Sequence, residues 1–101
     1  ATLDGTATGC IAIGNGTPPG GGTANQSYIY AKDDTDVSEM FVMDEDGNET
    51  KISPHDPVTG DWVFWSQNKR TGRRIEVNME RVVKLVEELS GEKLLFEESI
   101  S

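Results

Sequence analysis

The sequence has little of what most catalytic and metal sites are built from. It contains one cysteine, Cys10, which excludes an internal disulfide and a cysteine-rich zinc site. It contains one histidine, His55, which excludes a site made of several histidines. No apolar run approaches the roughly 20 residues that a membrane helix needs, so we expect no membrane insertion.

Positive charge is also scarce. The 101 residues carry 9 Lys and Arg against 18 Asp and Glu, a net charge of −9. Nucleic acids and anionic membranes are bound through basic surfaces, so we expect neither as the main partner. All of the net charge lies in residues 1–61, because residues 62–101 hold equal numbers of acidic and basic side chains.

Large apolar side chains are nearly absent before Tyr28. The segment 1–27 is rich in Gly and Thr, and such a segment cannot bury enough apolar surface to offset an ordering entropy of about 1–2 kcal/mol per residue. We expect it to be disordered or held by something outside itself. Within it, the residues Cys10–Ile13 predict a short strand, with Cys10 as a small buried hydrophobe. So short a chain, with so much of it outside the core, predicts that other copies complete the core.

The remaining sequence predicts a β-meander, a second hairpin and a helix. Turn residues separate apolar runs at 33–36, 44–48 and 69–72, and a loop with two prolines covers 53–61. We expect the strands at 28–32, 39–43, 49–52, 62–68 and 73–77. The fold class is therefore mainly β with a C-terminal α-helix, an α+β fold.

The second of these strands is apolar on both faces. Met40 and Val42 alternate with Phe41 and Met43, and a strand of this kind needs cover on both sides. So small a chain offers little such cover, which again favours association.

The predicted helix runs from Met79 to Ser90. Asn78 is a favoured N-cap and Gly91 stands where a left-handed C-terminal cap belongs. Two heptad steps form an apolar seam of Met79, Val82, Val86 and Leu89. The helix can pack on the 62–77 hairpin as part of a single-chain core, form the seam of a small bundle, or do both. The apolar patch 94–96 predicts a short strand or a return onto the hairpin, and residues 97–101 are expected to fray.

Two acidic motifs invite a chemical interpretation. In the stretch Asp44–Asn48, oxygen-bearing side chains alternate as in a calcium loop, but Glu49 and His55 occupy the positions where such a loop needs glycine and a bidentate acid. A β-turn explains this stretch, and a solvated hairpin tip explains the acids at 33–36. His55 beside Asp56 has no activated nucleophile near it in sequence, so we expect it to have a structural hydrogen-bonding role.

The aromatic strand and the basic turn are the other candidates. Trp62 and Trp65 could stack on a sugar, although core or interface roles explain them too. The basic residues at 69–74 favour a solvated turn or an ion pair between subunits over a phosphate site. No nucleophile, base and oxyanion donor come together, so we expect a protein that is not an enzyme and has no cofactor.

Two stretches carry a resemblance to a known family. An opening Ile-Gly-Asn-Gly-Thr-Pro-Pro at 13–19 precedes the strand Tyr-Ile-Tyr-Ala-Lys-Asp at 28–33. The hairpin Glu-Met-Phe-Val-Met-Asp-Glu-Asp-Gly-Asn follows at 39–48. Residues 11–55 in this way resemble segments of tail-fibre and related structural proteins of bacteriophages, and the strand and helix after residue 62 look like the C-terminal end of such proteins.

The resemblance implies an interwoven homotrimer that forms part of a virion. This homotrimer would take part in virion assembly and in attachment to the host. Its implied partners are its own copies, host-surface glycans or other virion proteins, and it brings no catalytic residues. The divisions would be a shaft-like segment 1–27, a meander 28–55 and a trimerisation or knob unit 56–101. Fibres normally carry a longer shaft and a tip, so we expect a fragment of a longer chain. A carbohydrate-binding module is the alternative. The residues expected at the interface are Tyr28, Tyr30, Phe41, Met43, Met79, Val82, Val86 and Leu89.

Overall fold

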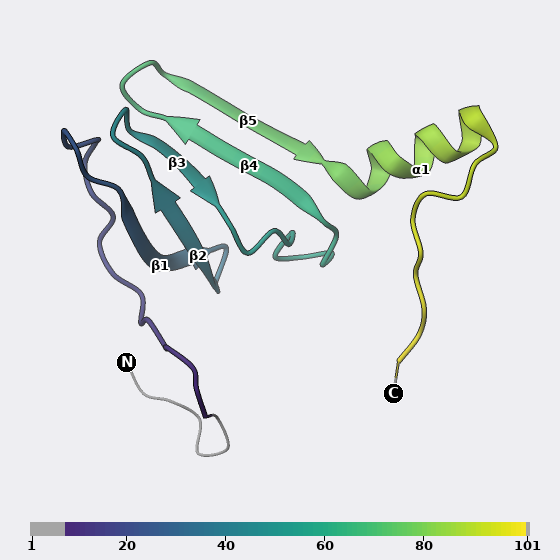
Figure 1. Cartoon of the computed structure of the whole chain (residues 1–101), viewed down its shortest axis with the longest axis horizontal. Helices are drawn as coiled ribbons and strands as arrows, with labels where there is room; N and C mark the ends of the chain where they lie inside the picture. Colours follow the sequence, from purple (N-terminus) through teal and green to yellow (C-terminus); the bar gives the residue numbers. More distant parts are fainter. Residues whose placement is uncertain (1–7, 101) are drawn as a thin grey trace.

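The computed structural model describes residues 8–100, which form one antiparallel sheet followed by a helix (Figure 1). The five strands are hydrogen-bonded in sequence order, so each strand lies beside the next one in the chain. The mainly β fold with a C-terminal helix is confirmed. The elements are β1 Tyr28–Asp34, β2 Val37–Met43, β3 Asn48–Lys51, β4 Val63–Asn68, β5 Arg73–Asn78 and α1 Met79–Ser90.

Turn chemistry sets the register of the sheet. Thr35 and Asp36 adopt positive φ between β1 and β2, and Gly47 does so between β2 and β3. The carboxylate of Asp44 accepts the backbone N–H groups of Asp46 and Asn48 at 3.0 and 2.9 Å, which closes the second turn. The Asp44–Asn48 stretch is therefore the β-turn that its sequence predicts.

The helix begins and ends where its capping residues predict. The side chain of Asn78 accepts the N–H of Arg81 at 2.9 Å. Gly91 takes φ 74°, and its N–H donates to the carbonyl of Glu87. Both ends of α1 are thus capped locally, and the N–H of Glu80 in its first turn also donates to the carbonyl of Trp62, next to β4, at 3.2 Å.

Alternate residues of the strands form the two faces of the sheet. The inner face carries the buried cluster of Tyr30, Phe41 and Met43, with Tyr28 and Trp65 packed against it. The Tyr30 and Phe41 rings stack at 6.1 Å, and Trp65 meets Phe41 edge-on at 5.6 Å. The Pro18–Gly22 segment lines a pocket with Met43, so this segment, the strap, lies over one end of the inner face.

The outer face of the sheet is more open than the inner face, although Ala31 on this face is buried. It carries Ile29, Val42, Phe64, Ile75 and Val77, and none of these is buried. Ile29 is 59% exposed and Phe64 is 39% exposed. The prediction that β2 is apolar on both faces is confirmed, and one of those faces has little cover from the chain itself.

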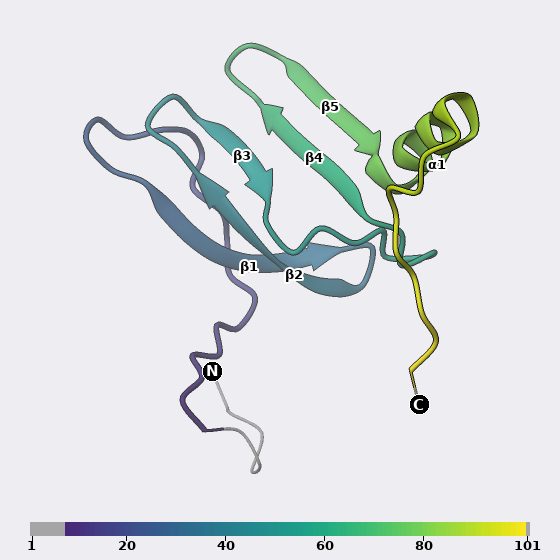
Figure 2. The same ribbon diagram turned by 45° about the vertical axis from the view of Figure 1, so that its right-hand side comes forward.

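The molecule is one layer thick and broad for its mass. Its radius of gyration is 16.7 Å, whereas a compact domain of this length has about 13 Å. Its accessible surface is 7519 Å², against about 5,600 Å² for a compact monomer of this mass. Figure 2 shows α1 beyond the ends of β4 and β5, lying across neither face of the sheet. No residue of α1 is buried, so the prediction of a single-chain core helix is wrong.

Three other expectations need correction. Cys10–Ile13 forms no strand and Cys10 is exposed, because these residues pair with no strand and stay outside the core. Its attachment is a short parallel bridge in which the N–H of Gly16 donates to the carbonyl of Ala31 at 2.9 Å. Residues 94–96 form no strand and make no return onto the hairpin, since the chain turns back beside α1. Of the 1–27 segment, residues 1–7 lie outside the described part.

Candidate functional site

A buried carboxylate organises the inner face. Glu49 is 3% exposed, and it accepts hydrogen bonds from the Tyr30 hydroxyl, the Lys32 amine at 2.9 Å and the Gln67 amide at 2.8 Å. Burial acts to raise the pKa of Glu49, but the three donors and the Lys32 charge outweigh it and lower the pKa. The same pairing raises the pKa of Tyr30, mainly through burial and then through the bond to Glu49.

The strand register brings this network together. Tyr30 lies opposite Phe41, and Glu49 lies between Met43 on one side and Gln67 on the other. The Lys32 amine also sits 4.6 Å from the centre of the Phe41 ring, an arrangement that adds cation–π attraction. Aromatic and charged groups therefore share one surface of the sheet.

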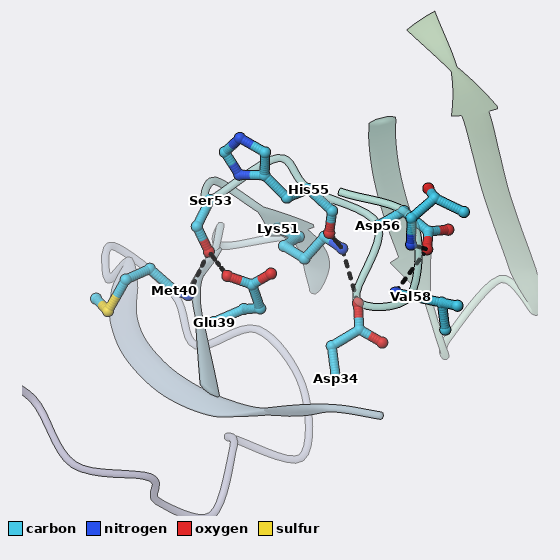
Figure 3. Close-up of polar contacts among 9 residues, drawn as sticks. Asp34, Glu39, Met40, Lys51, Ser53, His55, Asp56 and Val58 are labelled. Atoms are coloured by element: carbon cyan, nitrogen blue, oxygen red, sulfur yellow. Dashed lines mark hydrogen bonds and ion pairs between the residues drawn. The ribbon is translucent and has the colours of Figure 1, made fainter. Parts of the chain in front are cut away.

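A second buried charge ties the loop 53–61 to the first hairpin (Figure 3). The Lys51 amine donates to Asp34 Oδ2 at 2.7 Å and to the backbone carbonyl of His55 at 2.8 Å. Beside it, Ser53 Oγ donates to Glu39 Oε1 at 2.7 Å and accepts the backbone N–H of Met40 at 2.8 Å. This loop, which pattern alone leaves without structure, is fixed at one end of the inner face.

His55 takes part in this arrangement through its backbone. Its side chain is exposed, while its carbonyl holds Lys51 and its N–H donates to Ser53. The carboxylate of Asp56 accepts the N–H groups of Val58 and Thr59 and does not face the imidazole as a base partner would. The expected structural role therefore belongs to the main chain of His55.

The acidic turns do not gather into a metal site. Both carboxylate oxygens of Asp44 are engaged by Asp46 and Asn48, and no group of three metal-ligating side chains occurs among the residues that the structure describes. The carboxylate oxygens of Asp44 are therefore used in hydrogen bonds that hold the turn in place.

The strap closes a pocket of about 400 Å³ against the β2–β3 turn. Glu49 and Gln67 line its inner wall, and Lys69 and Arg70 line it from the β4–β5 turn. Gly22 lies so close to the backbone of Glu45 that any side chain at this position would overlap the Glu45 carbonyl. Close backbone packing therefore requires glycine at position 22.

The two tryptophans proposed for ligand binding do not form a common platform. Trp65 packs against the inner cluster, with Lys32 and Arg74 near its ring. Trp62 is 40% exposed, and by alternation it shares the outer side with Phe64. The exposed aromatic pair is therefore Trp62 and Phe64.

The residues expected at an oligomer interface divide into two groups. Tyr30, Phe41 and Met43 are already buried within the single chain, and Tyr28 packs against them, so their place at an interface stays a prediction. The helical seam is largely open, because Val82, Val86 and Leu89 are exposed and Met79 is half-buried.

Sequence reasoning missed the two buried charges, Glu49 and Lys51. They alternate with Thr50 in β3, and this spacing places them on the same face as Phe41 and Met43 once the register is known. The burial of Glu49 and Lys51 could therefore have been predicted from the alternation of residues in β3, once the turns on both sides of β2 were correctly placed.

No protein-family model, curated protein or solved structure matches this chain. Within residues 8–100, no helix is long and apolar enough to cross a membrane.

Proposed function

We propose that the chain is a non-enzymatic structural module that assembles as a homotrimer, of the kind found in bacteriophage tail fibres. In a virion it would serve assembly and host attachment. The observation that carries this proposal is the open apolar outer face, where Ile29, Phe64 and Trp62 stand 39–59% exposed on a sheet with one covered side.

Surface area supports association. The accessible surface exceeds that of a compact monomer by about 1,900 Å², and a standard interface removes about 800 Å² from each partner. Each chain of a closed trimer makes two such interfaces. The exposed apolar residues of α1 offer further apolar surface for association.

The inner face supports a structural role over a catalytic one. The polar groups of Glu49, Lys51 and Ser53 hold strands and loop together. No buried side-chain nitrogen or oxygen in the described part of the chain lacks a partner. Groups whose bonds are all used within the fold are suited to rigidity, which a fibre module needs.

Light scattering of the purified chain tests the proposal. We expect about three times the 11.0 kDa of one chain. Phe64→Glu places a charge on the outer face and should reduce the mass toward that of one chain. Val58→Glu is the matched control, because Val58 is exposed in the loop 53–61, away from the outer face. A wild-type mass of 11.0 kDa at micromolar concentration would refute the proposal.

Carbohydrate binding is the second candidate, and the exposed side chains of Trp62 and Phe64 favour it. Aromatic faces stack on the apolar faces of sugars. A glycan array should then show binding that Trp62→Ala abolishes without change in the circular dichroism spectrum. Ser38→Ala, in an exposed position of β2, is the control. Absence of binding to every glycan, with the wild type folded, would dismiss this candidate.

A further inference from the structure

The outer edge of β5, which is the edge that faces away from β4, is available for pairing. β5 is the last strand of the sheet, and no other strand within residues 8–100 lies beyond it. An edge strand presents a row of free N–H and C=O groups to which another chain can add. The edge of β1, by contrast, is partly occupied by the bridge at Asn15.

The C-terminal segment, residues 91–100, is paired with no strand of the sheet. After Gly91 it adopts neither strand nor helix, and its backbone is held beside α1 where Leu94 and Leu95 donate their N–H groups to Glu87 Oε2 at 2.7 and 2.9 Å. Phe96 is 79% exposed. The Leu94 bond is exposed to water and the Leu95 bond is partly buried, so their exchange for other hydrogen bonds costs little.

We propose that residues 94–98 of one copy add as an antiparallel strand to the outer edge of β5 in a second copy. This inference rests on the proposed homo-oligomer and identifies one of its contacts. The favoured register places Leu94 opposite Val77 and Phe96 opposite Ile75. The apolar side chains of the added strand then extend the outer face.

Charge supports the same register. It places Glu97 opposite Arg74 and Glu98 opposite Arg73, so both acids of the added strand meet a base. Arg73 forms no ion pair with the residues that the structure describes, and Arg74 contacts only neutral partners, Gln67 and the Trp65 ring. Opposite charges directly across a strand pair stabilise it.

The path of the chain favours a second copy. Figure 1 shows α1 continuing away from the end of β5. Its 12 residues carry the chain about 18 Å. Leu94 is hydrogen-bonded to Glu87 of this helix and forms no strand pair with β5 of its own chain. A neighbouring copy can present its β5 edge to this segment.

Disulfide trapping between two tagged chains tests the register. In a Cys10→Ser background, one chain carries Ile75→Cys and the other Phe96→Cys, since residues directly opposite in a strand pair lie within disulfide reach. After unfolding, mixing, refolding and mild oxidation, we expect a covalent dimer that contains both tags. Leu95→Cys replaces Phe96→Cys in the control, because Leu95 would point to the opposite face and should cross-link far less.

A charge exchange provides a second measurement. Arg73→Glu should weaken association about threefold, and Glu98→Arg in the same chain should restore it, because the pair is then reversed and intact. If the wild type is trimeric by light scattering but the mixed tags never cross-link and Glu98→Arg restores nothing, the strand exchange is refuted and the homotrimer stands. A wild type with the mass of one chain refutes both.

Discussion

Replacing Glu49 with alanine should destabilise the fold more than any surface charge substitution. The change removes the common acceptor of Tyr30, Lys32 and Gln67. The Tyr30 hydroxyl is left buried without an acceptor, whereas the Lys32 side chain is 23% exposed and can turn to water. We therefore expect the loss to come mainly from the buried hydroxyl and from the lost charge-assisted bonds.

The size of the effect follows from these contacts. A hydrogen bond to a charged group contributes about 1.5–3 kcal/mol, and removal of one partner from a buried ion pair costs about 3–5 kcal/mol. Partial exposure of Lys32 places the expected loss near the lower end, at about 3 kcal/mol. That is a large share of the 5–15 kcal/mol by which a domain is normally stable.

Urea unfolding at fixed protein concentration measures this loss. With a slope of about 1.5 kcal/mol per molar urea, the midpoint should fall by about 2 M. Glu49→Gln keeps a carbonyl acceptor and should fall by less. Lys84→Ala, which breaks the exposed pair with Glu80, is the control and should barely move the midpoint. If Glu49→Ala shifts the midpoint no more than this control, the inner-face network does not hold the sheet.

Three further predictions concern acid, the strap and the helix cap. The pKa of Glu49 is lower in the folded state than in the unfolded state. The ionised carboxylate therefore stabilises the fold above its unfolded pKa of about 4.3, and this stabilisation is lost as the pH falls through the folded pKa. Acid unfolding of Glu49→Gln should lack this loss of stability. Gly22→Ala should cost about 1–3 kcal/mol in urea unfolding because its methyl group would overlap the Glu45 carbonyl, and Gly20→Ala, which points into open space, should cost little. Asn78→Ala should cost about 1 kcal/mol and reduce the helical circular dichroism signal.

The sequence predicts the elements far better than it predicts what the elements bury. Gly47 and the Asn78 and Gly91 caps are local signals, so they place the β2–β3 turn and both helix ends within the chain itself. The burial of Glu49 depends on partners 17–19 residues away, which only the register of four strands, β1 to β4, brings together. The strap is similar, because nothing near Gly22 in sequence indicates that it will pack on the next turn.

The exposed apolar side chains of the outer face support the proposed assembly. A sheet with one wet side normally turns its apolar residues inward and its charges outward. Here the inner face holds Lys32, Glu49 and Lys51 beside its aromatic cluster, while Ile29 and Phe64 are exposed on the outer face. Full burial of one large apolar side chain contributes about 1.5–3 kcal/mol, so cover for the outer face would supply several times that amount. The proposed assembly through the outer face would provide this cover.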